Sequence, residues 1–162
     1  GCAGMHLVFI PHAGPGRLAY NSTQPNPERN AMAAFPQTHL DLFKKKAFAA
    51  FTTLMPDGSP QTTPVWVDYQ NGQIWVNSAL GRQKDKNVRR DPRVAVTIID
   101  ADNPYRYVEV RGRVTEITQA GSDAHIDAMA KKYLGQDKYP FRQPGEQRVL
   151  YKIAIDKAVS MG

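Results

Sequence analysis

One stretch of the chain reads GRQKDKNVRRDPR, from Gly81 to Arg93, and lies between two apolar runs that look like strands. It holds six Lys or Arg residues against two acids, so its local charge is +4 within a chain of net charge +6. Most of the excess charge is therefore in one place. Cations at a strand-to-helix junction, together with the free N–H groups of a helix start, can converge on an anion, above all a phosphate. We expect an anion site at this junction.

The composition fits one globular domain. The chain has 162 residues, of which 41% are hydrophobic and 22% charged, which is enough to bury a core. Residues 1–35 are rich in Gly, Pro and Asn and show neither helical nor strand periodicity. This composition predicts a flexible N-terminal extension over 1–35, followed by a folded domain over 36–162.

Several classes of protein are excluded by what the sequence lacks. The only cysteine is Cys2, which rules out a disulfide scaffold and a cysteine-based metal site. No apolar run approaches the ~20 residues needed to span a bilayer. We expect a soluble, cytoplasmic protein without a membrane partner. A pI of about 9.5 favours anionic partners, although charge alone does not choose among nucleic acid, acidic surfaces and phosphorylated small molecules.

Turn signals and β-branched runs predict a largely antiparallel β structure. Pro56-Asp57-Gly58 and Asn71-Gly72 are typical of tight turns between strands. From Tyr105 to Ile117 apolar and polar residues alternate, so one face of this strand is expected in the core and the other in water or against a second chain. The predicted strands are Ala47 to Leu54, Gln61 to Tyr69, Ile74 to Asn77, Val94 to Ile99, Tyr105 to Ile117 and Arg148 to Ile155.

One short helix is expected before the first of these strands and two between later strands. One is capped by Thr38 and runs through Phe43, one follows the basic turn, and one is capped by Ser122 or Asp123 and ends before Gly135. Strands joined mostly by short hairpins, with few helices between them, favour a mainly β fold, a small barrel with appended helices, over a βαβ sheet.

No hydrolase or metalloenzyme motif is present, so the chemistry is not that of a side-chain nucleophile or a metal. We interpret the four histidines, His6, His12, His39 and His125, as surface residues, and no catalytic side chain stands out. The basic turn and the aromatic strands remain. Together they could hold an organic cofactor whose own ring performs the reaction.

Three parts of the chain carry a resemblance to a known family. Val76-Asn77-Ser78 followed by Gly81 to Val94 resembles the phosphate-binding segment of the split β-barrel flavin and deazaflavin proteins related to pyridoxamine 5′-phosphate oxidase. The hairpin from Pro56 into Trp66 also resembles that family, as does Val108 to Gly112. Within the family, the match is best to the group that uses coenzyme F420. The resemblance implies that residues 36–162 form a split β-barrel cofactor-binding domain, an FMN-binding type of barrel.

The resemblance also implies which residues contact the cofactor. Arg82 and Lys84 would hold its phosphate, since Arg offers a planar fork and Lys a point charge. A strand segment ending at Trp66 would lie along the ring, although Trp66 is equally well explained as a core aromatic. We expect Arg89 and Arg90 on the outer face of the helix. The implied cofactor-binding set is Pro64, Val65, Trp66, Asn77, Ser78, Arg82, Gln83, Lys84 and Asn87.

Three hypotheses about function follow. The first is an oxidoreductase in which coenzyme F420, bound in the groove of a homodimer, transfers hydride to an unsaturated organic small molecule. The oligoglutamate tail of that cofactor would then contact Lys86 and the lysines at 44–46. The second hypothesis is an FMN-binding flavin reductase or oxidase-like protein. The third is a nucleic-acid-binding module, which the clustering of the cations at one turn disfavours.

Two further expectations come from the resemblance. The homodimer it implies has a candidate interface on the polar face of Tyr107, Arg111 and Arg113. True pyridoxamine-phosphate oxidases end in a substrate-binding segment with a Trp and an Arg-Leu pair. This chain ends instead in the sequence from Tyr151 to Gly162, so oxidation of vitamin B6 is not expected.

Overall fold

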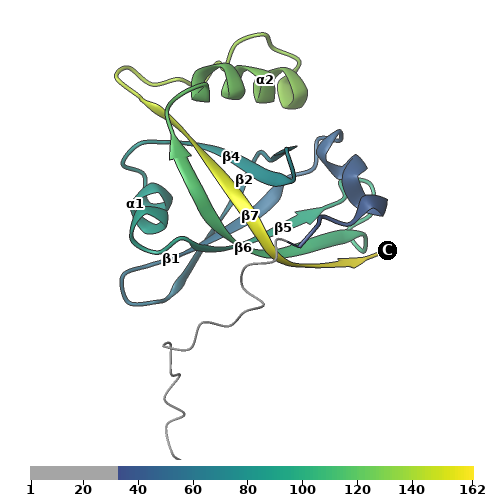
Figure 1. Ribbon diagram of the computed structural model, residues 1–162. Helices are drawn as coiled ribbons and strands as arrows, with labels where there is room; N and C mark the ends of the chain where they lie inside the picture. Colours follow the sequence, from purple (N-terminus) through teal and green to yellow (C-terminus); the bar gives the residue numbers. More distant parts are fainter. Residues whose placement is uncertain (1–32) are drawn as a thin grey trace, which may run out of the picture.

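A computed structural model describes residues 33–162 (Figure 1). Most of the predicted extension, 1–35, lies outside the described residues. Its last residues belong to the packed part of the chain, because Phe35 is buried in the core and the Ala33 N–H donates to the Ile155 carbonyl at 2.8 Å. No helix among the described residues is both long and apolar enough to cross a bilayer.

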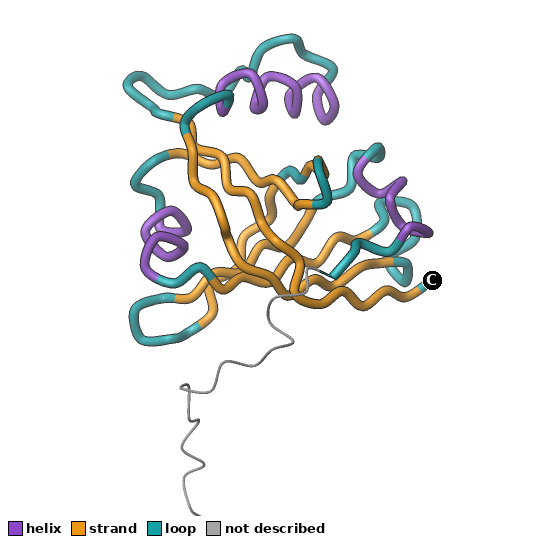
Figure 2. The backbone as a smooth tube through the Cα atoms, in the orientation of Figure 1, coloured by secondary structure: helices purple, strands orange, loops and turns teal. Residues whose placement is uncertain are grey.

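The described residues form one antiparallel sheet with helices outside it (Figure 2). The strand order is β2-β1-β5-β6-β7-β4-β3. The strands are β1 (Ala49–Leu54), β2 (Pro60–Val65), β3 (Asp68–Gln70), β4 (Gln73–Ala79), β5 (Arg93–Ile99), β6 (Tyr107–Thr118) and β7 (Arg148–Met161). The helices are the 3₁₀ helix η2 (Gln37–Phe43) and the α-helices α1 (Gln83–Arg90) and α2 (Ser122–Leu134).

The long strand β7 joins the two halves of the sheet, because it pairs with β6 along most of its length and with β4 through its first residues. Its inward side chains meet the β-branched faces of β1, β4, β5 and β6 in a single core. As predicted, the apolar residues of β6 point inward and its Arg and Glu residues lie toward the surface. The predicted mainly β fold with appended helices is thus confirmed.

The predicted strand from Gln61 to Tyr69 is wrong in one respect, since it is interrupted at Trp66 and Val67. The reason lies in helix α2. The Val67 N–H donates to the Tyr133 hydroxyl at 3.2 Å, and the Val67 carbonyl accepts from Lys132 Nζ at 2.8 Å. Side chains of α2 thereby replace the sheet partners of this residue, and the chain forms two strands, β2 and β3, where one was predicted.

Four other expectations need correction. The helix at Thr38 is a 3₁₀ helix without a side-chain cap, because Thr38 Oγ1 pairs with His39 Nδ1 at 2.8 Å. His39 is buried and not on the surface, with Nε2 3.2 Å from the Met161 carbonyl oxygen. Helix α2 ends before Gly135 as predicted, but Gly121 and not Ser122 or Asp123 is its N-cap. Strand β7 continues beyond Ile155 because it pairs with the first half of β6.

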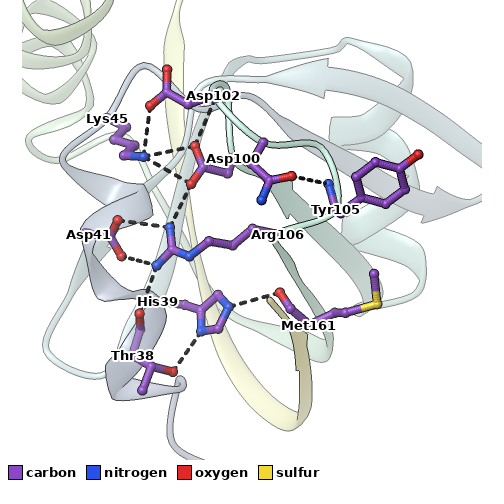
Figure 3. Close-up of polar contacts among 10 residues, drawn as sticks. Thr38, His39, Asp41, Lys45, Asp100, Asp102, Tyr105, Arg106 and Met161 are labelled. Atoms are coloured by element: carbon purple, nitrogen blue, oxygen red, sulfur yellow. Dashed lines mark hydrogen bonds and ion pairs between the residues drawn. The ribbon is translucent and has the colours of Figure 1, made fainter.

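A charged cluster fastens η2 to the loop between β5 and β6 (Figure 3). The Arg106 guanidinium donates to Asp41 at 2.6 Å and to Asp100 at 2.7 Å, and Lys45 Nζ donates to Asp100 at 3.0 Å and to Asp102 at 2.9 Å. The Asp102 N–H, Arg106 and Lys45 together hold the pKa of Asp100 well below its usual range. Lys45 is therefore ion-paired with two carboxylates, Asp100 and Asp102.

Gly112 lies where β6 and β7 approach most closely, at a bulge in their pairing. A Cβ atom at this position would stand 2.3 Å from the Ala154 carbonyl oxygen, which is backbone and has no freedom to move aside. Gly112→Ala is therefore expected to lower the free energy of unfolding by about 2 kcal/mol. Urea denaturation followed by tryptophan fluorescence measures this change. Arg111→Ala, at the exposed neighbouring position, should alter it by less than about 0.5 kcal/mol, and equal effects would contradict the explanation.

Candidate functional site

A pocket of about 180 Å³ lies between the turn before α1, the ends of β2 and β4, helix α2 and the loop that follows it. Seven of the nine predicted cofactor-binding residues line it. They are Pro64, Val65, Trp66, Asn77, Ser78, Arg82 and Lys84. Gln83 and Asn87 do not line it. The other lining residues are Phe48, Ile126, Tyr139, Phe141 and Arg148.

The turn that presents the cations is held from below by Asp85, which is 2% exposed. The Asp85 carboxylate accepts hydrogen bonds from the Gly81 N–H at 2.9 Å, from Arg89 Nε at 3.1 Å and from the Tyr151 hydroxyl at 3.1 Å. Gly81 has φ +81°, a conformation that L side chains rarely adopt. This carboxylate therefore fixes both the turn and the start of α1.

Helix α1 begins at Gln83, so Arg82 is its N-cap and Lys84 lies in its first turn. The N–H groups of a first helical turn have no partner within the helix and can bind an anion. Burial, together with the neighbouring positive charges of Arg82 and Arg148, lowers the pKa of Lys84. An anion bound between these groups would relieve their mutual repulsion.

Arg148 is a third cation at the pocket, and sequence reasoning missed it. Its side chain is only 3% exposed. Arg148 Nε donates to Asn77 Oδ1 at 2.9 Å, Nη1 donates to Glu146 at 2.8 Å, and the guanidinium lies 5.1 Å from the centre of the Tyr139 ring. Glu146 also pairs with Arg82 at 3.2 Å. One carboxylate thus pairs with two cations, and Lys84 adds a third positive charge to the pocket.

Ser78 lines the pocket but is almost completely buried. Its Oγ is shielded from solvent and lies close enough to the Tyr151 hydroxyl to influence that residue's pKa. The hydrogen bond expected from Ser78 to a ligand stays a prediction.

Asn87 and Gln83 serve the scaffold. Asn87 is fully buried, and its Nδ2 donates to Thr53 Oγ1 at 3.0 Å while its Oδ1 accepts from Gln83 Nε2 at 2.9 Å. These bonds tie α1 to β1. Arg89 and Arg90 are exposed as expected, the first paired with Asp85 and the second bonded to the Leu54 carbonyl and to Asn87. The predicted ligand contact of Asn87 stays a prediction, and in the structure its amide is engaged by Thr53 and Gln83.

The other wall of the pocket is aromatic. Trp66 stacks on Tyr133 with ring centres 5.1 Å apart and planes 6° from parallel, and the edge of Tyr139 meets it at 5.9 Å. Phe141, which lies against Tyr139, is largely exposed. Trp66 packs in a small cluster with α2 and also lines the pocket. It can therefore be a core aromatic and a pocket residue at the same time, and its contact with a cofactor ring stays a prediction.

A polar network extends from the pocket under α2. His125 was expected on the surface but is buried, because α2 presses it against β3 and β4. Its Nε2 lies 3.2 Å from Asp68 Oδ2 and its Nδ1 lies 3.3 Å from Asn77 Nδ2. Burial of Asp68 would raise its pKa, but hydrogen bonds from His125, Gln70 and the Tyr69 N–H outweigh it and lower the pKa to about 2. Within residues 33–162 no cluster of three or more His, Cys, Asp or Glu side chains could hold a metal ion.

Comparison with known proteins matches this chain, over residues 35–161, to the family described as pyridoxamine 5′-phosphate oxidase. The chain belongs to this family. Its members are flavin- or deazaflavin-binding domains, and the split β-barrel fold expected from the sequence is confirmed.

Solved structures agree on the fold. A protein described as an F420 reductase is 28% identical, with a TM-score of 0.67, and the match covers 77% of this chain and 98% of that one. A conserved hypothetical protein from Mycobacterium tuberculosis is 24% identical, with a TM-score of 0.61 and coverage of 82% and 88%. General stress protein 26 from Bacillus anthracis is 18% identical, with a TM-score of 0.53 and coverage of 74% and 88%.

The low pKa of Asp68 predicts an acid-sensitive contribution to stability. The folded-state pKa, about 2, lies below the unfolded value of about 3.9. The contribution, about 2 kcal/mol, is therefore present above pH 4 and is lost as the pH falls toward 2. Asp68→Asn should lower the free energy of unfolding by about this amount at pH 7 and by much less at pH 2.5, measured by urea denaturation. Asp123→Asn, at an exposed carboxylate of α2, should show no comparable change, and a deficit independent of pH at Asp68 would contradict the assignment.

Proposed function

We propose that the protein is an oxidoreductase that binds coenzyme F420 in this pocket and transfers hydride to an unsaturated organic small molecule. The observation that carries the proposal is the convergence of Arg82, Lys84 and Arg148 on one pocket, next to the wall formed by Trp66. Three cations suit a phosphate, and a flat aromatic wall suits a ring system.

The residues present fit such a cofactor at both of its ends. The phosphate would lie at the first turn of α1, where the cations meet free N–H groups. The ring would lie along Pro64, Val65 and Trp66 at the end of β2. A bound deazaflavin supplies the hydride chemistry, so the protein has to bind it, orient it and keep water away. The similarity to a protein described as an F420 reductase supports this cofactor.

FMN is the second candidate, and one observation favours it. The lysines at 44–46 were expected to contact an oligoglutamate tail, but Lys45 is held by Asp100 and Asp102. Part of the cationic surface assigned to the tail is thus already neutralised. A cofactor without that tail, with the same phosphate and a similar ring, needs only the pocket beside α1. A nucleic-acid partner is not proposed, because the cations converge on a pocket instead of following a groove.

The phosphate assignment is tested by titrating the purified protein with coenzyme F420 and with FMN, following ring fluorescence. Arg82→Ala combined with Lys84→Ala should weaken the tighter of the two ligands about 100-fold, because two charge-assisted contacts are lost. Lys157→Ala is the control, since Lys157 is an exposed cation of β7 that is absent from the pocket lining and from the tail contacts expected above. Unchanged affinity in the double variant would show that the phosphate binds elsewhere.

We also propose that a second copy of the chain completes the groove. Phe48 is 54% exposed and Ile99 is 42% exposed, and both border an apolar depression of about 380 Å³ across β1, β2 and β5. This depression shares Phe48 and Pro64 with the pocket beside α1. The interface suggested by the sequence is less favourable, because Arg111 is paired with Glu109 of its own chain.

Sedimentation equilibrium measures the proposed assembly. The wild-type protein should sediment as a dimer, and Ile99→Asp should shift it toward the monomer because a charge is then buried at the interface. Circular dichroism should show the fold of the variant to be intact. A wild-type monomer at all concentrations up to 100 times the cofactor Kd would refute the shared groove.

A further inference from the structure

Arg148 is positioned by a chain of side-chain contacts that ends in a titratable group. Asn77 lies between Arg148 and His125, and it accepts from the first and contacts the second. None of these contacts is part of the phosphate assignment above. Together they connect a buried imidazole under α2 to a cation in the pocket.

The orientation of the Asn77 amide is fixed by two partners of opposite kind. Arg148 has only donors, so the Asn77 oxygen must face it, at 2.9 Å from Nε. The Ser122 carbonyl has only acceptors, so the Asn77 nitrogen must face it, at 2.7 Å. An amide flip would break both contacts. The NH₂ group of Asn77 is thus held toward His125.

This orientation determines the tautomer of His125. The Asn77 nitrogen is a donor, so His125 Nδ1, 3.3 Å away, must present its lone pair. The proton of the neutral ring is then on Nε2, where it is donated to Asp68 Oδ2 at 3.2 Å. Neutral His125 satisfies every group in the chain. A second proton, on Nδ1, would place an N–H against the NH₂ of Asn77.

We propose that His125 is a positioning residue that couples the placement of Arg148 to protonation of its own imidazole. With a neutral ring, Asn77 is held in place and in turn holds Arg148 in the pocket. Protonation of Nδ1 displaces Asn77, and Arg148 loses its Nε contact. The consequence for ligand affinity rests on the proposed function, whereas the coupling itself does not.

Charged groups of β3, α2 and β7 lie near His125 or near its partners. Asp68 of β3 would pair with the protonated ring and offset its charge. Lys132 of α2 interacts electrostatically with Asp68, and Lys152 of β7 lies over the Trp75 ring, whose centre is 5.8 Å from that of His125. The net effect of protonation on a phosphate in the pocket is therefore the loss of Arg148 alignment rather than a gain of positive charge.

Two substitutions separate the two contacts of the ring. His125→Asn places an amide near the position of Nδ1, so it keeps an acceptor for Asn77 but cannot titrate. His125→Gln reaches toward Asp68 but leaves Asn77 without its acceptor. A purely structural role for His125 would make both variants less stable without any effect on pH dependence.

The coupling is tested by NMR of the protein without added cofactor, following the Arg148 Nε–H signal and the His125 ring between pH 5 and 8.5. In the wild type the Arg148 signal should move with the titration of the ring. In His125→Asn it should stay constant near its position at pH 8.5. The proposal is overturned if the ring titrates without a change at Arg148, if the Arg148 signal still moves in His125→Asn, or if the ring does not titrate in this range.

The consequence for binding is tested with FMN and with coenzyme F420. Between pH 8 and pH 5.5 the wild-type affinity should fall about fivefold more than that of His125→Asn, a comparison that removes the titration of the phosphate itself. His125→Gln should bind about fivefold more weakly than His125→Asn at pH 8. Parallel pH profiles for the wild type and His125→Asn would overturn the effect on affinity. If the wild type binds neither ligand, the proposed function fails, and the Arg148 signal still decides the coupling.

Discussion

The carboxylate of Asp85 is the interaction on which the pocket depends. It is buried and joins three parts of the structure. These are the turn at Gly81, the last turn of α1 through Arg89, and the core through Tyr151 of β7. A buried charge is stable only when its partners are in place, so these elements hold one another in a single arrangement. The Asp85 carboxylate holds the turn that carries Arg82 and Lys84, although Asp85 itself does not line the pocket. A buried negative charge thus positions two positive charges at the pocket.

The parts of the site that were predictable are those contained in a continuous segment. The basic turn places Arg82 and Lys84 two residues apart, and their convergence follows from local geometry alone. Turn signals likewise located the hairpins, and the β-branched runs located the core. The fold class could therefore be predicted, and the resemblance of the segment from Val76 to Val94 fixed the family.

The missed residues depend on contacts between distant segments. Arg148 is buried because Asn77, 71 residues away, and the neighbouring Glu146 accept its hydrogen bonds, and the sequence around Arg148 does not reveal the contact with Asn77. His125 looked like a surface residue because polar neighbours flank it on α2, and only the packing against β3 and β4 buries it. Asn87 was assigned to the ligand by its place in the basic stretch, yet the helix turns it toward Thr53. In each case the direction of a side chain was decided by the tertiary structure.

The break between β2 and β3 links the pocket wall to the folding of helix α2. Val67 gives its N–H to Tyr133 and its carbonyl to Lys132, and Trp66 stacks on the same tyrosine. The wall therefore has no backbone support from the sheet at this point. Segments that share their hydrogen bonds in this way open and close as one cooperative unit. Transient loosening of α2 would release Trp66 and uncover the aromatic wall of the pocket, while the cationic side, built on α1 and the core, stayed folded. The aromatic wall can thus open without unfolding of the barrel.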